Sequence, residues 1–313
     1  MKTRRRLLAT SPCVLLLAAL ATCDLQVVSK EVPPKDPPLN LPESKTKLVP
    51  DKGLKLPPQA KDAGKLASFD PQIVGGKGAY RGQWPWQVFV TVDKTSLCGG
   101  SLIYPQWVLT AAHCADTYTN FTLQLGAVDR NSFENGRVTV GTTQKFVHPN
   151  YNRVNINNDI ALLKLPAPLF QTSTAFIGSV KLPTDQKNTY EGQMATASGW
   201  GKLDDSLSIT PVLQYVSMPV ISNSKCVNVF GSAYVINSNI CTDTTGSKST
   251  CQGDSGGPLV HFNSTTRTYT LIGVTSFGAQ DNCGTGKYPA VFTRVSSHLA
   301  WIASTVASQS FLG

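Results

Sequence analysis

The sequence predicts an all-β fold followed by one terminal helix, and two observations lead there. Only 15% of the 313 residues are charged, whereas Gly (25 residues) and Pro (20 residues) are frequent. Such a composition favours strands and turns over long charged helices. From Ile73 on, short runs of β-branched and aromatic residues recur between turn formers, which is typical of a β-sandwich or of β-barrels. The 241 residues from Ile73 onward suffice for two barrels of about 120 residues each.

Each apolar run between turn signals is expected to form a strand. In chain order these runs are Gln87–Val92, Ser101–Tyr104, Trp107–Leu109, Phe121–Leu125, Arg137–Val147, Ala161–Leu165, Met194–Trp200, Val212–Val220, Leu259–Phe262, Thr268–Ser276 and Val291–Val295. Only the last segment of the chain looks strongly helical. Leu299, Ile302 and Val306 recur there near the helical period, and Ser296 can cap its start.

Residues 1–23 are expected to be a secretory signal peptide. A basic start (Met1–Arg6) precedes an apolar stretch (Leu7–Ala21), and small residues allow cleavage after Ala21 or after Cys23. An uncleaved anchor helix and a lipidated Cys23 are the alternatives. This signal predicts a secreted, extracellular protein. No run of 18 apolar residues occurs, which excludes a polytopic membrane protein.

Residues 24–72 are expected to be a disordered propeptide rich in Pro and Lys. Nine prolines, eight lysines and one aromatic residue, Phe69, leave too little apolar surface to offset the entropy of ordering. A ligand for a proline-binding module and an anchor to anionic polymers are the alternative functions. Residues 1–72 carry 12 Lys/Arg against 7 Asp/Glu, +5 of the net +9, so the remainder gives little reason to expect nucleic-acid binding.

The cysteines predict three disulfides and no metal site. An even number in a secreted context favours disulfides, and six follow Ile73: Cys98, Cys114, Cys226, Cys241, Cys251 and Cys283. Six cysteines allow 15 pairings, and their spacing does not choose among them. No CxxC pair occurs and the four histidines lack ligand spacing, so neither a metal nor a cofactor is expected.

Three local signatures carry residues suited to nucleophilic catalysis. They are Leu109-Thr-Ala-Ala-His113-Cys114, Asn157-Asn158-Asp159-Ile160-Ala161-Leu162-Leu163 and Cys251-Gln-Gly253-Asp254-Ser255-Gly256-Gly257-Pro258. Taken singly, His113 could be a core histidine and Asp159 a loop carboxylate. The glycines around Ser255 suit a tight turn that exposes the hydroxyl and directs backbone N–H groups at one point.

Together the signatures resemble the trypsin/chymotrypsin family of serine endopeptidases. The resemblance extends from Ile73 to about Trp301 and includes Ile73-Val-Gly-Gly76, Trp84-Pro-Trp86, Cys98-Gly-Gly-Ser101, Ser198-Gly-Trp-Gly201 and Ser276-Phe277-Gly278. It implies two antiparallel six-stranded β-barrels with a C-terminal helix in residues 73–313. It also implies the pairs Cys98–Cys114, Cys226–Cys241 and Cys251–Cys283.

The resemblance implies a role for each residue of the signatures. Ser255 would be the nucleophile and His113 its base, while Asp159 would hold the imidazole tautomer. The N–H groups of Gly253 and Ser255 would form the oxyanion hole, and Ser276 would support the carboxylate of Asp159. The chain order His, Asp, Ser differs from that of subtilisins and α/β-hydrolases.

Activation of a zymogen is implied as well. Cleavage after Gln72 would give Ile73 a free α-ammonium group, which would pair with the carboxylate of Asp254. The residue before the cut is Gln72, whereas the family commonly has Arg or Lys there. Either a protease other than a tryptic one activates the chain, or a cut at Lys65 is followed by trimming.

The residues implied for the substrate pocket carry no charge. Ser249 would be its floor, Gly278 an open wall, Ala290 a slightly narrowed part, Phe277 the side of the channel and Ile156 the wall of the second subsite. We expect cleavage after large apolar residues, because an uncharged floor does not compensate for burying Arg or Lys. A broad collagenolytic or elastase-like specificity is the alternative.

The remaining expectations concern partners and modification. Asn120 and Asn263 begin Asn-X-Ser/Thr sequons and are candidate glycosylation sites. Ala127 stands where calcium-binding relatives have an acidic ligand, so calcium is not expected. Protein substrates, an activating protease and protein inhibitors are the expected partners of a monomer. An inactive binding protein on the same scaffold is the competing function.

Overall fold

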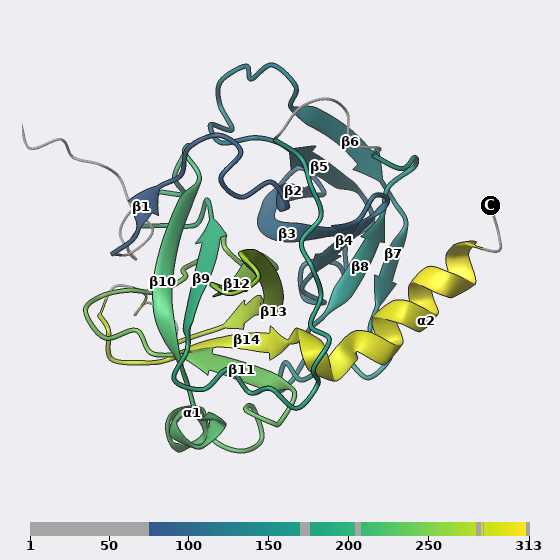
Figure 1. The fold of residues 1–313 in the computed structure, drawn as a ribbon. Helices are drawn as coiled ribbons and strands as arrows, with labels where there is room; N and C mark the ends of the chain where they lie inside the picture. Colours follow the sequence, from purple (N-terminus) through teal and green to yellow (C-terminus); the bar gives the residue numbers. More distant parts are fainter. Residues whose placement is uncertain (1–74, 170–175, 204–207, 280–282, 284, 311–313) are drawn as a thin grey trace, which may run out of the picture. The chain divides into compact units, whose positions relative to one another are not determined.

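In the computed structural model, two antiparallel β-sheets form the body of the protein (Figure 1). The structure describes residues 75–169, 176–203, 208–279, 283 and 285–310. The expected signal peptide, the propeptide and Ile73 lie outside these residues. Both sheets are barrel-like, as the family resemblance implied. The second is a closed six-stranded barrel, whereas the first has seven strands instead of the expected six and is a half-barrel in the described residues.

Seven strands form the first barrel-like sheet in the order β6-β5-β2-β3-β4-β8-β7. Their bounds are β2 (Gln87–Val92), β3 (Ser96–Tyr104), β4 (Trp107–Thr110), β5 (Phe121–Leu125), β6 (Val138–Thr142), β7 (Lys145–Val147) and β8 (Ala161–Lys164). The edge strands β6 and β7 are separated by only two residues, Thr143 and Gln144. Lys164 N–H donates to Gln144 O at 3.0 Å, so the bent β6–β7 segment joins the two edges of the sheet.

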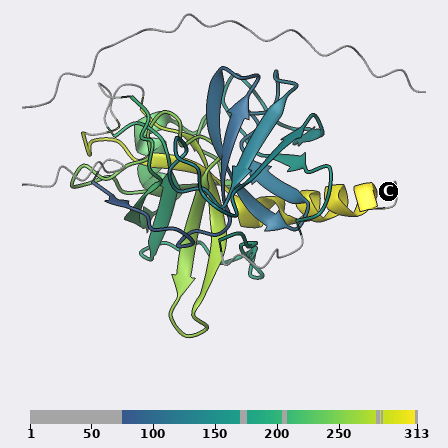
Figure 2. The ribbon, with the colours of Figure 1, turned by 90° about the horizontal axis from the view of Figure 1, so that it is seen from above.

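The second sheet closes into a six-stranded barrel, because β10 pairs with both β11 and β9. Its strands are β9 (Met194–Gly199), β10 (Gln214–Ile221), β11 (Asn239–Thr242), β12 (Pro258–Asn263), β13 (Thr268–Phe277) and β14 (Ala290–Arg294), and the short β1 (Lys77–Gly78) adds to β10. Residues alternate along β10 between buried and partly buried positions, as a strand with one face in the core requires. In Figure 2 the hairpin of β12 and β13 extends beyond the rest of this barrel.

Three segments differ from the strands expected from sequence. The segment Arg137–Val147 is interrupted after Thr142, whose hydroxyl donates to Lys164 O at 2.6 Å while Gln144 N–H donates back to that hydroxyl at 3.1 Å. The strands β1 and β11 were not expected. Both are very short and lie next to turn-forming residues, so neither shows an apolar run.

The helices are α1 (Asn223–Phe230), the 3-10 helix η1 (Val295–His298) and α2 (Leu299–Ser310). The terminal helix confirms the expectation, whereas α1 was missed. The expected cap at Ser296 is wrong, because this residue lies inside η1 and its buried hydroxyl has no hydrogen-bond partner. No helix in the described part of the chain is long and apolar enough to cross a membrane.

Disulfides fasten the loops around the two barrels. The bonded pairs are Cys98–Cys114, Cys226–Cys241 and Cys251–Cys283, with Cα–Cα distances of 6.3, 6.5 and 5.3 Å. These are the pairs implied by the family resemblance. Between the barrels, Trp200 lies edge-on to Phe89 with ring centroids 5.3 Å apart.

Candidate active site

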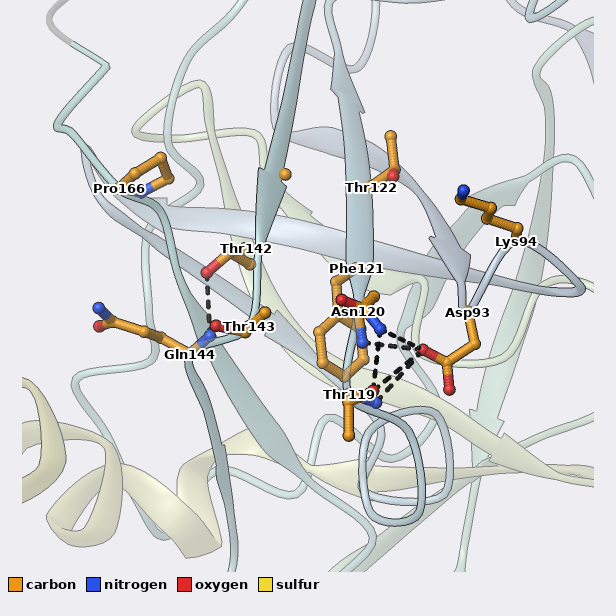
Figure 3. Close-up of a pocket in the computed structure, with 11 residues that line it drawn as sticks. Asp93, Lys94, Thr119, Asn120, Phe121, Thr122, Thr142, Thr143, Gln144 and Pro166 are labelled. Atoms are coloured by element: carbon orange, nitrogen blue, oxygen red, sulfur yellow. Dashed lines mark hydrogen bonds between the residues drawn. The ribbon is translucent and has the colours of Figure 1, made fainter.

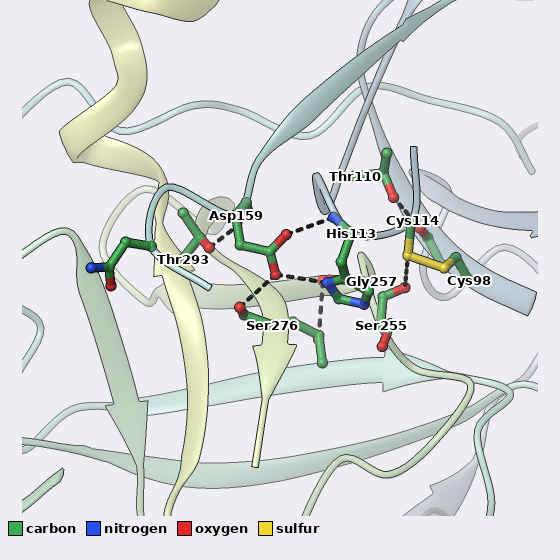
Figure 4. Close-up of polar contacts among 12 residues, drawn as sticks. Cys98, Thr110, His113, Cys114, Asp159, Ser255, Gly257, Ser276 and Thr293 are labelled. Carbon is green, nitrogen blue, oxygen red and sulfur yellow. Dashed lines mark hydrogen bonds and ion pairs between the residues drawn. A yellow bond between two sulfur atoms is a disulfide. The ribbon is translucent and has the colours of Figure 1, made fainter. Parts of the chain in front are cut away.

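His113 and Asp159 meet because their strands are neighbours. His113 follows β4 by three residues, Asp159 precedes β8 by two, and Thr110 of β4 pairs with Ala161 of β8. The backbone N–H of His113 donates to Asp159 Oδ1 at 2.9 Å, and His113 Nδ1 lies 2.7 Å from Asp159 Oδ2 (Figure 4). The carboxylate therefore fixes both the backbone and the ring of His113.

The second barrel holds the same carboxylate from its other side. Asp159 is fully buried, and the hydroxyl of Ser276 in β13 donates to its Oδ2 at 2.6 Å. The hydroxyl of Thr293 in β14 donates to the Asp159 carbonyl at 2.7 Å. Sequence reasoning missed Thr293, because a single threonine in a strand belongs to no motif.

The Asp159 contact sets the tautomer and the basicity of His113. Burial lowers the pKa of His113, but the charge of Asp159 and its hydrogen bond outweigh burial and raise the pKa above 6.5. Because Nδ1 lies 2.7 Å from the carboxylate of Asp159, we assign the proton to Nδ1, which leaves the Nε2 lone pair free. The side chain is 32% exposed, so substrate can reach it.

Backbone contacts hold Ser255 next to the segment that carries His113. Gly99 N–H donates to Ser255 O at 2.7 Å, and Gly256 N–H donates to Thr275 O at 2.8 Å. A Cβ atom on Gly256 would lie 2.2 Å from Thr110 Oγ1, and its φ of +80° suits glycine. This close approach requires a residue without a side chain after Ser255.

In Figure 4 the imidazole of His113 lies between the carboxylate of Asp159 and the side chain of Ser255. The disulfide-bonded Cys114, next to His113, has its sulfur 3.6 Å from Ser255 O. In the described part of the chain no hydrogen bond joins Ser255 Oγ to His113. Such bonds often tighten only when substrate is bound.

Two backbone N–H groups beside Ser255 are unused. In the described residues, the N–H groups of Gly253 and Ser255 donate to no protein acceptor, whereas Asp254 N–H donates to Cys251 O at 3.0 Å. Gly253 has a φ of +100°, which glycine adopts readily. The loop thus offers two donors, on either side of Asp254, to a negatively charged oxygen.

Asp254 itself is buried without a cation among the described residues. Its Oδ1 accepts from Gly201 N–H at 2.8 Å and its Oδ2 from Cys251 N–H at 2.9 Å. Burial raises the pKa of Asp254 to about 6 despite these two bonds. Its expected partner, the α-ammonium group of Ile73, lies outside the described residues.

A cavity of about 200 Å³ opens beside Ser255, and four of the five residues expected to shape the substrate pocket line it. Its described lining is uncharged: Ser249, Thr250, Cys251, Gln252, Ser255, Thr275, Ser276, Phe277, Gly278, Ala279, Cys283, Tyr288, Pro289 and Ala290. Ser249 is buried and its hydroxyl donates to Thr250 O at 2.8 Å. Ile156 lies outside this lining, in the loop before Asp159.

A larger cavity of about 840 Å³ lies on the first barrel, away from these residues (Figure 3). Its lining combines hydroxyl and amide side chains with Asp93 and Lys94, and contains no histidine, serine or cysteine among the described residues. Asn120 borders it, and its amide donates to Asp93 Oδ1 at 3.2 Å. The other sequon residue, Asn263, is exposed at the end of β12. No group of three or more possible metal ligands occurs in the described ranges.

Comparisons with known proteins agree with this geometry. The family model for trypsin matches residues 73–302. Brachyurin of Leptuca pugilator is 46% identical over 231 residues, which are 74% of this chain and 96% of that protein. Vitamin K-dependent protein C of Mus musculus is 35% identical over 251 residues, 77% of this chain and 53% of that one.

A solved structure described as HL collagenase superposes with a TM-score of 0.66 at 35% identity and covers 75% of this chain and 99% of that chain. The fold therefore has a counterpart in a solved structure. The chain belongs to the trypsin family and is a serine endopeptidase.

Proposed function

We propose that this protein is a secreted endopeptidase, made as a zymogen, that cleaves peptide bonds with Ser255, His113 and Asp159. One observation carries the proposal. His113 Nδ1 lies 2.7 Å from a buried carboxylate that Ser276 also holds, and Ser255 lies beside the same histidine. A serine hydroxyl is a weak nucleophile at neutral pH and needs such an oriented base.

The chemistry follows from these positions. Ser255 Oγ attacks the scissile carbonyl carbon while its proton passes to His113 Nε2, and the resulting imidazolium is stabilised by Asp159. The free N–H groups of Gly253 and Ser255 receive the oxyanion of the tetrahedral intermediate. His113 then gives the proton to the leaving amine. Water repeats the sequence on the acyl-enzyme and releases the second product.

Activation would depend on Asp254. A carboxylate buried without a counterion is costly, and cleavage after Gln72 would supply the α-ammonium group of Ile73 as its partner. The pairing would fix the Gly253–Ser255 loop and with it the oxyanion donors. Because Gln72 precedes the cut, the activating protease would not be tryptic unless a cut at Lys65 comes first.

The uncharged pocket supports cleavage after large apolar side chains. Apolar surface gains about 25 cal/mol per Å² on entering such a cavity, whereas a cation would be buried there without a partner. Ala290, 3% exposed, fills part of the cavity, so Phe, Leu and Met should do at least as well as Tyr, and Trp should do worse. The second candidate is a collagenolytic or elastase-like specificity, which the similarity to brachyurin and to a collagenase favours.

The proposal also includes secretion by way of a signal peptide (1–23) and removal of a propeptide (24–72). Asn120 and Asn263 would carry glycans. Both asparagines are exposed, as carriers of glycans must be. Protein inhibitors would bind across the same pocket. The expected state is a monomer that needs neither a metal nor a cofactor.

The proposal is tested with the chain cleaved after Gln72 and a peptide substrate with Phe before the scissile bond. Wild-type protein should hydrolyse it, and Ser255→Ala should not. Ser132→Ala is a matched control, because that exposed hydroxyl bonds only within its own surface loop. An inactive wild-type chain whose N-terminus is Ile73 would favour the binding-protein alternative.

A further inference from the structure

The turn that carries His113 ends in carbonyl groups that need partners. The N–H groups of Ala115 and Asp116 donate to Ala112 O at 2.9 and 2.8 Å, and Tyr118 N–H donates to Ala115 O at 3.3 Å. The chain therefore makes a short helical turn directly after β4. Ala115 O thus accepts one hydrogen bond inside the turn. The carbonyl groups of Asp116 and Tyr118 lie at its end, where a helical turn offers no partner, so another segment must satisfy them.

Lys145, the first residue of β7, supplies these partners. Its ammonium group donates to the carbonyl oxygens of Ala115 at 2.8 Å, of Asp116 at 2.6 Å and of Tyr118 at 2.6 Å. An ammonium group has three N–H donors, and all of them are used on this one turn. No carboxylate of the described residues lies within ion-pair distance of Lys145. Its charge therefore acts on carbonyl groups and not in a salt bridge.

The strand that carries Lys145 also helps to place Asp159. Val147 of β7 pairs with Ala161 of β8, two residues after Asp159. Figure 1 shows the two strands side by side. Lys145 therefore links the turn that carries His113 to the strand pair that leads to Asp159.

A second contact on the same turn is weaker. The carboxylate of Asp116 forms an ion pair with Arg153, whose side chain is 63% exposed. Exposed ion pairs contribute little because water and salt screen them. Lys145 is partly buried and makes three hydrogen bonds from one atom. Its contacts therefore hold the turn more strongly than the ion pair of Asp116 with Arg153.

We propose that Lys145 is a positioning residue for His113, one that holds the imidazole at bonding distance from Asp159. The inference rests on the proposed role of His113 as the base. Lys145 does not line the pocket beside Ser255, so its loss should leave substrate binding unchanged. The turn would move, the contact between His113 and Asp159 would lengthen, and proton transfer would slow.

The experiment compares Lys145→Met with wild type in the cleaved enzyme. We expect kcat to fall about tenfold, less than the 10²-fold that a misplacement of about 1 Å costs, while KM stays within about twofold. The acid limb of the kcat/KM profile should move to lower pH, because a looser Asp159 raises the pKa of His113 less. A residue that only stabilises the fold would leave this limb in place.

Lys164→Met is the matched control. Lys164 lies in the adjacent strand β8, and its ammonium group also bonds a carbonyl, that of Gln309 at 3.1 Å, but in α2. This variant should keep the wild-type kcat and pH profile. Unchanged kcat and an unchanged acid limb in folded Lys145→Met would overturn the inference, as would equal losses in Lys164→Met.

A second variant covers the case in which Lys145→Met does not fold. Lys145→Arg keeps the charge, but a planar guanidinium cannot direct three donors from one point at the three oxygens. It should show a smaller loss in kcat and a smaller shift of the acid limb in the same direction, and wild-type behaviour would overturn the inference. Full activity in a variant refutes only the role of Lys145, whereas an inactive wild-type enzyme refutes the proposed function.

Discussion

The two barrels contribute differently to the proposed reaction. The first barrel carries His113 and Asp159, and every polar atom of that carboxylate has a partner: His113 twice and Ser276 once. The second barrel carries Ser255 on a glycine-rich loop beside Asp254. That second carboxylate is equally buried, but the described residues give it only two backbone N–H donors and no cation.

The pKa values reflect this difference. Asp159 raises the pKa of His113, and the pair is complete in the fold as described. The pKa of Asp254 rises to about 6, because burial penalises a charge that has no counterion. In the proposed mechanism, strand pairing places the base in advance, whereas the loop of the nucleophile would gain its counterion from the Ile73 ammonium group. This difference agrees with the proposed activation of a zymogen.

The largest expected effect concerns the contact between the two barrels. Ser255→Ala and His113→Ala should each lower kcat by a factor on the order of 10⁶, and the double variant should lose little more, because the two residues act as a unit. Steady-state kinetics on purified, cleaved variants measure this. Additive losses would mean that the two residues do not share a proton transfer.

The substrate pocket belongs to the second barrel alone and is expected to decide specificity. On a peptide series that varies only the residue before the cut, kcat/KM for Phe should exceed that for Arg or Lys by about 10² or more, because several kcal/mol of desolvation stay uncompensated. Ser249→Asp should narrow that gap. Arg or Lys within tenfold of Phe would refute the pocket assignment, and Ala equal to Leu would favour an elastase-like enzyme.

The role of Asp254 can be tested through stability. Its pKa is raised from 3.8 to about 6, so the folded chain favours the protonated acid. Stability is then lost as pH rises from about 4 through 6, by about 3 kcal/mol for a shift of this size. Pairing with the Ile73 ammonium group would remove the loss.

Urea unfolding of the uncleaved and the cleaved chain, at pH 4 and at pH 7, measures this effect. The cleaved form should gain stability over the uncleaved form between the two pH values, and Asp254→Asn should abolish that gain. An equal pH dependence of both forms, with Asp254 intact, would argue against the ion pair.

A further expected effect on stability concerns His148, in the segment that leads to Asp159. Burial and then the neighbouring His298 lower the pKa of His148 to about 4. The folded state therefore resists protonation, and stability should fall as pH drops from 6.5 toward 4. His148→Gln should flatten that slope in acid unfolding curves, and the measurement compares this variant with the wild-type chain. A slope unchanged by His148→Gln would assign it to other groups.

Sequence reasoning succeeded where a pattern is local. The expected strands Gln87–Val92 and Phe121–Leu125 match β2 and β5, because a run of β-branched and aromatic residues between turn formers is visible within a few residues. The family of the chain could be predicted because its glycine-rich and histidine-containing segments are specific to that family. The strands β1 and β11 and the helix α1 are short and depend on tertiary contacts. Such contacts cannot be predicted from the residues of these elements alone.

The residues that support the site could not be predicted from the sequence either, because their roles also depend on tertiary contacts. Thr293 and Lys145 are single polar residues within strands. The residues next to them in the sequence do not differ from those around a solvent-exposed polar residue. Their importance comes from what the fold brings to them: the carbonyl of Asp159 in one case and the three carbonyls of the His113 turn in the other. Ser296 shows the opposite error, because a local pattern predicted a role that the fold does not give it. The residue was expected to cap the terminal helix but is buried inside η1.

Covalent labelling with an organophosphate tests most directly whether the two barrels form one catalytic site. In the chain cleaved to start at Ile73, we expect one label per molecule, found by peptide mapping on Ser255, and almost none in His113→Ala or in the uncleaved chain. No label on Ser255 in the cleaved wild-type chain, or equal labelling of Ser255 without His113, would contradict the assignment of Ser255 as a nucleophile activated by His113.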